Sequence, residues 1–371
     1  MNRKSRLVLL VLLALSLSGC GGGDRKDLED LTIVLIVGID LDENNNVIFY
    51  ESSPVFSKEA KDKEEQYGVK AMTFREAREK FDTKVTALTV GGEIELVLLG
   101  KKLLASDDWF RLLDIFYREE KSTVSARVVA VDGPVKDIIY EKAENKPRLP
   151  LHLTKLIDTS YRRNLTVKTT LQELRRQVTD KGLTPSISEI KKGKGLELKG
   201  TALLDERGKY ALPLGIEENA LFHILMGRRV GEMTITISIP DAERSTGKIE
   251  TNKLSFMAER ISTNTRSSYE KGRFHFDLNA SLGVNMVERL FADDPSIDLE
   301  RIIAEQLRMK LKALIAKFQA HRIDPLGLGM YARAFHYKEW KQVQEHWGEE
   351  LAKSDINVSV KVEIKKKGAV K

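Results

Sequence analysis

Apolar and polar residues alternate most regularly in the C-terminal half of the chain. Residues 233–239, 274–284 and 356–364 carry apolar side chains at every second position, with mostly polar residues between them. In an extended strand, this period of two puts the apolar side chains on one face and the polar ones on the other. We therefore expect three half-buried strands, each with one face in a core and one in water.

A different period predicts a long helix between the second and third of these strands. Apolar side chains recur every three or four positions over residues 297–320 and form one stripe: Leu299, Ile303, Leu307, Leu311, Leu314 and Phe318. Glu300 near the start and Lys317 near the end complement the helix dipole. We expect this amphipathic helix to pack on the C-terminal sheet.

The N-terminal half predicts a mixture of strands and helices. Residues 31–39 form an apolar, β-branched run, and a polar turn at 40–46 joins it to a second strand at 47–55 as a hairpin. Further strands are expected at 94–99, 125–131 and within 196–214, helices at 73–84, 109–117, 135–140, 165–178 and 217–226, and a charged loop at 57–67. The whole pattern predicts an α+β protein with mainly antiparallel or mixed sheets flanked by helices.

Two breaks in the pattern predict how the chain is divided. Residues 189–195, Glu-Ile-Lys-Lys-Gly-Lys-Gly, read as a linker. We therefore expect an N-terminal α+β region over residues 25–190 and a C-terminal α+β domain over residues 191–371. A second break, near residues 145–150, leaves open a division of the first region into two subdomains, which makes two or three domains in all.

The first residues have the layout of a secretory signal peptide. Basic residues, Arg3, Lys4 and Arg6, precede an apolar run at 7–17 and a short stretch of small residues. An uncleaved membrane anchor is the alternative, but the run is about half the ~20 residues that a spanning helix needs. No later apolar run approaches that length. We therefore expect residues 1–19 to be a signal peptide.

The residues that follow this run resemble a bacterial lipobox. Leu17-Ser18-Gly19-Cys20 places a leucine three residues before the only cysteine of the chain. The resemblance implies an S-diacylglycerol group on Cys20, cleavage after Gly19, and N-acylation of the new terminus. Two or three acyl chains give stable anchoring where one is marginal. Residues 20–24 would then form a lipidated, glycine-rich tether.

Charge argues against nucleic acid as a partner. The formal net charge is +6, and removal of the leader takes away three basic residues. The remaining excess is too small to predict a nucleic-acid-binding surface.

Motifs that carry catalytic chemistry are absent from the sequence. None of the six histidines belongs to an HExxH motif, and neither a G-x-S-x-G elbow nor a phosphate-binding loop occurs. No motif therefore points to an enzymatic activity or to a bound cofactor.

One stretch offers a weak metal candidate. Acidic and amide residues fall at calcium-loop positions 1, 3, 5, 7 and 12, namely Asp40, Asp42, Asn44, Asn46 and Glu51. Position 6 of a calcium loop requires glycine, but Asn45 occupies it here. The flanking sequences also predict strands rather than helices. A plain hairpin turn is the favoured interpretation, and calcium stays the alternative.

The order of several segments resembles one family. The segments are Asp27-Leu28-Glu29-Asp30-Leu31-Thr32-Ile33-Val34 after the lipobox, Gly38-Ile39-Asp40, the stretches 94–140 and 200–227, Asp324-Pro325-Leu326-Gly327-Leu328-Gly329, Lys338-Glu339-Trp340-Lys341 and Trp347. They resemble the Ger(x)C family, the lipoprotein C subunit of spore germination nutrient receptors. Two features depart from it: glycines stand at 21–23 where the family often has tryptophan, and a histidine ahead of Glu95-Leu96 is missing.

The resemblance implies a non-catalytic receptor subunit made of α+β domains. Its partners would be the membrane-embedded A and B subunits, its lipid contact would run through Cys20, and its location would be the outer face of the cytoplasmic membrane, in spores the inner spore membrane. Two other classes stay open. A solute-binding lipoprotein of a transporter would need repeated βαβ units and a parallel sheet. An envelope enzyme would need paired carboxylates or a metal triad.

Overall fold

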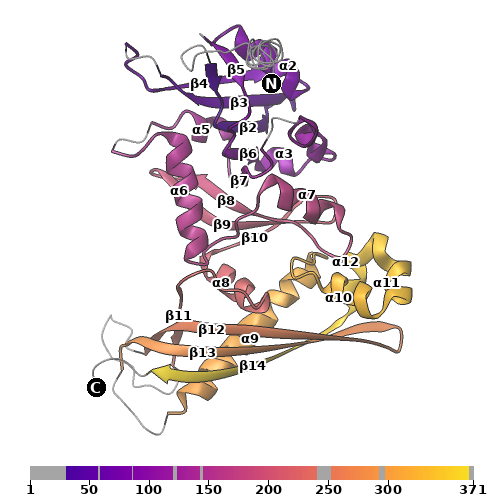
Figure 1. Ribbon diagram of the computed structural model, residues 1–371. Coiled ribbons are helices and arrows are strands. Elements are labelled where there is room, and N and C mark those ends of the chain that lie inside the picture. Colours follow the sequence, from indigo (N-terminus) through magenta and orange to yellow (C-terminus); the bar gives the residue numbers. More distant parts are fainter. Residues whose placement is uncertain are drawn as a thin grey trace, which may run out of the picture.

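The computed structural model describes residues 31–56, 59–85, 87–119, 123–142, 145–239, 252–291 and 297–366. The described residues form sheets of eight, four and two strands, flanked by helices. The eight-stranded and four-stranded sheets follow one another along the molecule (Figure 1). This architecture confirms the predicted α+β class. The signal peptide, the tether and Cys20 lie outside the described residues.

The eight-stranded sheet has a parallel centre and antiparallel flanks. Its order is β10-β9-β8-β7-β6-β2-β3-β4, and β2, β6, β7 and β8 run parallel. Every residue of β6 is buried, as expected for a strand covered on both faces. The bounds are β2 (Ile36–Leu41), β3 (Val47–Pro54), β4 (Glu64–Lys70), β6 (Leu96–Gly100), β7 (Arg127–Val131), β8 (Ser186–Lys192), β9 (Leu196–Leu204) and β10 (Tyr210–Leu214).

The predicted hairpin at residues 40–46 is confirmed, because β2 and β3 pair antiparallel across that turn. The run at 31–39 is not one strand, however. It divides into β2 and the short β1 (Leu31–Ile33), which pairs in parallel with β5 (Leu88–Val90). The prediction of a charged loop over residues 57–67 is wrong for its last residues, because β4 begins at Glu64.

The linker expected at residues 189–195 is also wrong. Its residues form the end of β8 and the turn into β9, with Lys192 opposite Leu196. Lys192 at the end of β8 and Lys194 in the turn are exposed, which is why the stretch looks like a linker in the sequence. The sheet thus continues across residue 190, where we placed the domain boundary. The division into two regions stays a prediction.

Helices cover both faces of this sheet. On one face lie α2 (Phe74–Asp82), α3 (Lys101–Leu104), η2 (Trp109–Leu113), α4 (Asp114–Arg118) and α7 (Leu171–Thr179). On the other lie α5 (Val135–Ile139) and α6 (Leu149–Arg162). The helix predicted at 165–178 starts later, at Leu171. Residues before it run beside β7 instead, and Thr169 O accepts the backbone N–H of Val128.

The four-stranded sheet has the order β11 (Met233–Ser238), β12 (Lys253–Glu270), β13 (Arg273–Arg289) and β14 (Asp355–Lys366). The long helix α9 (Leu299–Ala320) crosses one of its faces (Figure 1). Its stripe, including Leu307 and Leu311, shares a core with Phe276 and Leu282 of β13, which confirms the predicted packing. The pattern missed β12, because Thr, Ser and Asn occupy both faces of its second half.

Five short helical segments complete the second half of the chain. They are α8 (Ile216–Leu225), α10 (Leu328–Phe335), α11 (Tyr337–Val343), η3 (Gln344–His346) and α12 (Trp347–Lys353). We call the eight-stranded sheet with its helices the N-terminal lobe, and the four-stranded sheet with α8 to α12 the C-terminal lobe. No helix among the described residues is both long and apolar enough to span a bilayer.

Candidate functional site

A cleft of about 850 Å³ opens where three parallel strands of the N-terminal lobe end. Its walls are the segments that follow β2, β6 and β7, which include Asp42, Lys102 and Gly133. In open α/β sheets, small ligands bind in the crevice outside the carboxyl ends of parallel strands. Both the position and the size of this cleft therefore suit a small-molecule site.

Asp40 fixes the base of the cleft. Its side chain is only 6% exposed, and its carboxylate accepts the backbone N–H groups of Leu41 and Val135, both at 2.8 Å. Burial raises the pKa of Asp40, and the two backbone hydrogen bonds oppose that rise. A β-carbon on Gly100 would lie 2.0 Å from Asp40 Oδ1, so the end of β6 must be glycine. Asp40 thus ties β2 to the start of α5.

Charged side chains at the rim are arranged around Asp42. Lys70 Nζ lies 2.6 Å from Asp42 Oδ2, and Lys102 donates to the backbone carbonyl of Asp42. The hydrogen bonds from Lys70 and Asn46 lower the pKa of Asp42 well below its usual range. Asp42 also accepts the backbone N–H groups of Asn44 and Asn46, which closes the hairpin turn.

A chain of polar contacts leads from the cleft to the sheet edge. Lys101 and Lys199 bind the two oxygens of Asp132 at 2.9 and 2.7 Å. Lys199 also lies 3.3 Å from the fully buried Glu189, which accepts the Tyr210 hydroxyl at 2.7 Å. Burial raises the pKa of Glu189. These side-chain contacts connect the ends of β6 and β7 to β8, β9 and β10, which also pair through backbone hydrogen bonds.

The structure brings together three of the four weak metal candidates. Asp40, Asp42 and Asn44 line the cleft, whereas Glu51 lies buried in β3 and does not. Among the described residues, no three acidic, histidine or cysteine side chains are placed to share a metal ion. The calcium alternative therefore gains no support.

The sequence patterns did not single out Asp132 or the lysines of the cleft as candidate site residues. A usable signal was present: Lys101 directly follows the buried strand β6, and Asp132 directly follows β7. Polar residues at such strand ends meet at one sheet edge when the strands are parallel.

The cleft can bind a small polar ligand, with lysines and acids at its rim and Ile48 and Tyr50 as apolar surface. The described lining contains no serine, cysteine or histidine. It therefore lacks the nucleophile and base of a hydrolytic triad.

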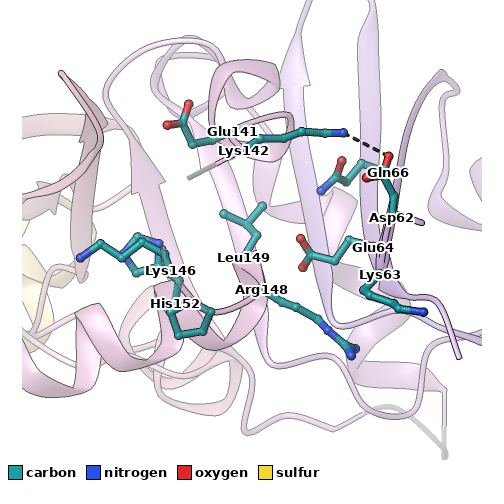
Figure 2. A pocket seen from close by; sticks show the side chains of 11 residues that line it. Asp62, Lys63, Glu64, Gln66, Glu141, Lys142, Lys146, Arg148, Leu149 and His152 are labelled. Carbon is teal, nitrogen blue, oxygen red and sulfur yellow. Dashed lines mark hydrogen bonds and ion pairs between the residues drawn. The ribbon is translucent and has the colours of Figure 1, made fainter. Parts of the chain in front are cut away.

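A smaller groove of about 290 Å³ lies between β4 and the start of α6. Figure 2 shows Glu64 of β4 directed toward Leu149 of α6, with the ion pair between Asp62 and Lys142 at one end. Burial raises the pKa of Glu64 and lowers that of His152. The groove falls at the lower limit of volume for small-molecule sites, which favours the cleft at the strand ends.

Two family models match this chain over most of its length. The spore germination protein N-terminal domain matches residues 24–192, and the spore germination B3/GerAC-like C-terminal domain matches residues 199–368. The chain belongs to the Ger(x)C family of spore germination proteins, which confirms the resemblance seen in the sequence.

Individual relatives match from end to end. Spore germination protein B3 of Bacillus subtilis (strain 168) is 24% identical, with 100% of both chains covered. Spore germination protein KC of the same organism is 20% identical, over 99% of this chain and 97% of its own. The crystal structure of the GerBC protein has a TM-score of 0.58 at 17% identity and covers 91% of this chain and 100% of its own. At that identity, the likeness concerns the fold.

Proposed function

We propose that this protein is the lipid-anchored C subunit of a nutrient receptor that triggers spore germination. The observation that carries the proposal is the match of both family models, in order, to the two halves of the chain. The subunit acts by contact with the membrane-embedded A and B subunits and catalyses no reaction.

Attachment through Cys20 restricts how the subunit meets the membrane. A fully extended chain from Cys20 to Leu31 spans at most about 40 Å. Leu31 begins β1, which pairs with β5 at the end of the molecule that also carries α2 (Figure 1). This end of the N-terminal lobe is therefore held within about 40 Å of the lipid, on the outer face of the cytoplasmic membrane or the inner spore membrane.

One observation favours the alternative of a solute-binding lipoprotein: parallel strands end at the cleft. Affinity purification of the tagged full-length protein from spore membranes separates the two functions. We expect mass spectrometry to recover two membrane subunits encoded beside this protein. Recovery of a transporter permease, or of no membrane partner, would contradict the receptor assignment.

Substitution of Cys20 tests the anchor separately. Cys20→Ala should leave the precursor uncleaved or mislocalised and impair germination, while circular dichroism of the folded part stays unchanged. A variant that is still lipidated and membrane-bound would refute the lipobox. Cys20→Ala should also abolish recovery of the membrane subunits, if anchoring brings them together.

A further inference from the structure

A separate cleft of about 600 Å³ lies between the two lobes. The N-terminal lobe contributes residues from α6, α7 and β8, and the C-terminal lobe contributes residues from α8, α10 and the segment after α8. Small-molecule sites occur preferentially at such junctions. A molecule bound here would contact both lobes at once.

Two fixed contacts between the lobes lie beside this cleft. At one, the fully buried Asn164 donates from Nδ2 to Glu232 O at 3.0 Å and accepts the Val230 N–H at 2.9 Å. At the other, Arg333 binds Asp180 through two hydrogen bonds of 3.1 Å. Val230 of the first contact and Met330 of α10, near the second, both line the cleft. The cleft thus lies between two sets of hydrogen bonds that connect the lobes. We call this region of contact the joint between the lobes.

The lining is predominantly cationic. Lys168, Arg176 and Arg228 line the cleft, against one acidic residue, Glu173. Glu173 is already engaged, because both its oxygens bind Arg176, at 2.7 and 3.0 Å. Lys168 pairs with Asp158, outside the lining, at 3.1 Å. No carboxylate among the described residues forms an ion pair with Arg228, so its positive charge is available to a ligand in the cleft.

His223 adds an unused hydrogen-bonding atom. The ring is 3% exposed, and its Nε2 lies 3.2 Å from Thr166 O, a carbonyl that can only accept. Nε2 therefore carries the proton, and Nδ1 is an acceptor without a partner among the described residues. Burial and, to a lesser extent, Arg228 lower the pKa of His223, so the ring stays neutral. Met226 and Met330 supply apolar surface nearby.

We propose that the cleft between the lobes binds a small organic anion, a carboxylate or a phosphate. Its charge pairs with Arg228, its apolar body lies against Met226 and Met330, and a donor group reaches His223. Because the ligand contacts both lobes, binding strengthens the joint between them. This inference does not depend on the receptor assignment and concerns a site distinct from the cleft at the strand ends.

The test uses the purified full-length protein in detergent and two probes, butyrate and inorganic phosphate, each compared with sodium chloride at equal ionic strength. A ligand that binds only the folded state raises the melting temperature. We expect one probe to do so, and the better probe identifies the preferred anionic group. If neither probe exceeds sodium chloride at concentrations up to tens of millimolar, the proposal is wrong.

Two neighbouring arginines give a matched pair of variants. Arg228 lines the cleft, whereas Arg229, also exposed, does not. Arg228→Ala should weaken binding of the better probe about tenfold, the usual order for loss of a charge-assisted contact, and Arg229→Ala should leave it unchanged. If both variants bind the better probe with equal affinity, binding depends only on general surface charge, and the proposed site is wrong.

Hydrogen exchange tests the bridging role. The Val230 N–H, which is bonded to Asn164 across the joint, should exchange more slowly when the better probe is bound. Binding without slower exchange there would contradict a ligand that strengthens the joint.

Discussion

The indole Nε1 of Trp347 donates a hydrogen bond of 2.8 Å to the carboxylate of Asp324. The same carboxylate accepts the backbone N–H groups of Leu328 and Gly329, at 3.0 and 2.7 Å, where α10 begins. Asp324 is 1% exposed. One buried side chain therefore holds the start of α10 against the start of α12.

Removal of this carboxylate should destabilise the protein. Asp324→Ala leaves three buried donors without an acceptor, and each such donor costs about 1–3 kcal/mol. We expect the free energy of unfolding in urea to fall by about 3 kcal/mol or more. Asp277→Ala, on the exposed face of β13, is the control and should change it little. Equal losses in the two variants would show that the Asp324 network contributes nothing specific.

A second prediction concerns the close approach of two glycines at the joint between the lobes. A β-carbon on Gly182 would lie 2.8 Å from the carbonyl carbon of Gly329 and from Met330 N, both backbone atoms. Gly182→Ala should therefore push the lobes apart and cost about 1–3 kcal/mol, the usual penalty of overpacking. Faster hydrogen exchange at Thr184 N, which donates to Asp324 O, would locate the effect.

Gly195→Ala is the control for this substitution, because its β-carbon would meet nothing within 4 Å. Its melting temperature should stay close to that of the original protein. If Gly182→Ala melts at the same temperature as this control, the lobes are not in contact there.

Local periodicity accounts for the parts of the fold that the sequence predicts well. The alternation at 233–239, 274–284 and 356–364 corresponds to β11, β13 and β14, and the stripe at 297–320 to α9. Each of these signals needs only neighbouring residues. The contact between Gly182 and Gly329 joins positions far apart in the chain, so no local pattern carries it.

The same reason limits prediction of the candidate site. Asp40, Asp42 and Asn44 attracted notice as a short pattern, but the cleft also needs Lys101 and Asp132 from later strand ends. Whether those ends meet depends on the parallel order of β2, β6 and β7, which a buried apolar run does not reveal. The positions of Lys101 and Asp132 directly after two buried runs therefore indicate the cleft only once the strand order is known.

The third prediction concerns the buried carboxyl of Glu51 and the dependence of stability on pH. Glu51 is 1% exposed, and neither of its oxygens has a hydrogen-bond partner among the described residues. Burial, followed by the charges of Glu65 and Asp82, raises its pKa from the ordinary 4.5 to about 8, while Arg78 opposes the rise. Between these two pH values, Glu51 therefore keeps its proton in the folded protein and releases it in the unfolded chain.

A group that holds its proton more tightly in the folded state destabilises that state as pH rises. The contribution of Glu51 to stability should thus fall between about pH 4.5 and about pH 8 and stay constant above that range. The free energy of unfolding of Glu51→Gln, relative to the original protein, should increase by a few kcal/mol over the same range, since a tenfold change in a proton-binding constant corresponds to about 1.4 kcal/mol. Exposed Glu43→Gln should show no such trend, and a flat difference for Glu51→Gln would contradict the assignment.

The last prediction tests the packing of α9 on the four-stranded sheet. Leu307 is fully buried in the core that α9 shares with β13, whereas Met309, two residues on, is 53% exposed. Leu307→Asp would place a carboxylate in this core without a partner, which costs several kcal/mol even if the group takes up a proton. Met309→Asp adds the same group to the same helix but leaves it in water. We expect a large drop in melting temperature for the first variant and a change of a degree or two for the second. Similar melting temperatures would mean that the stripe on α9 does not support the sheet.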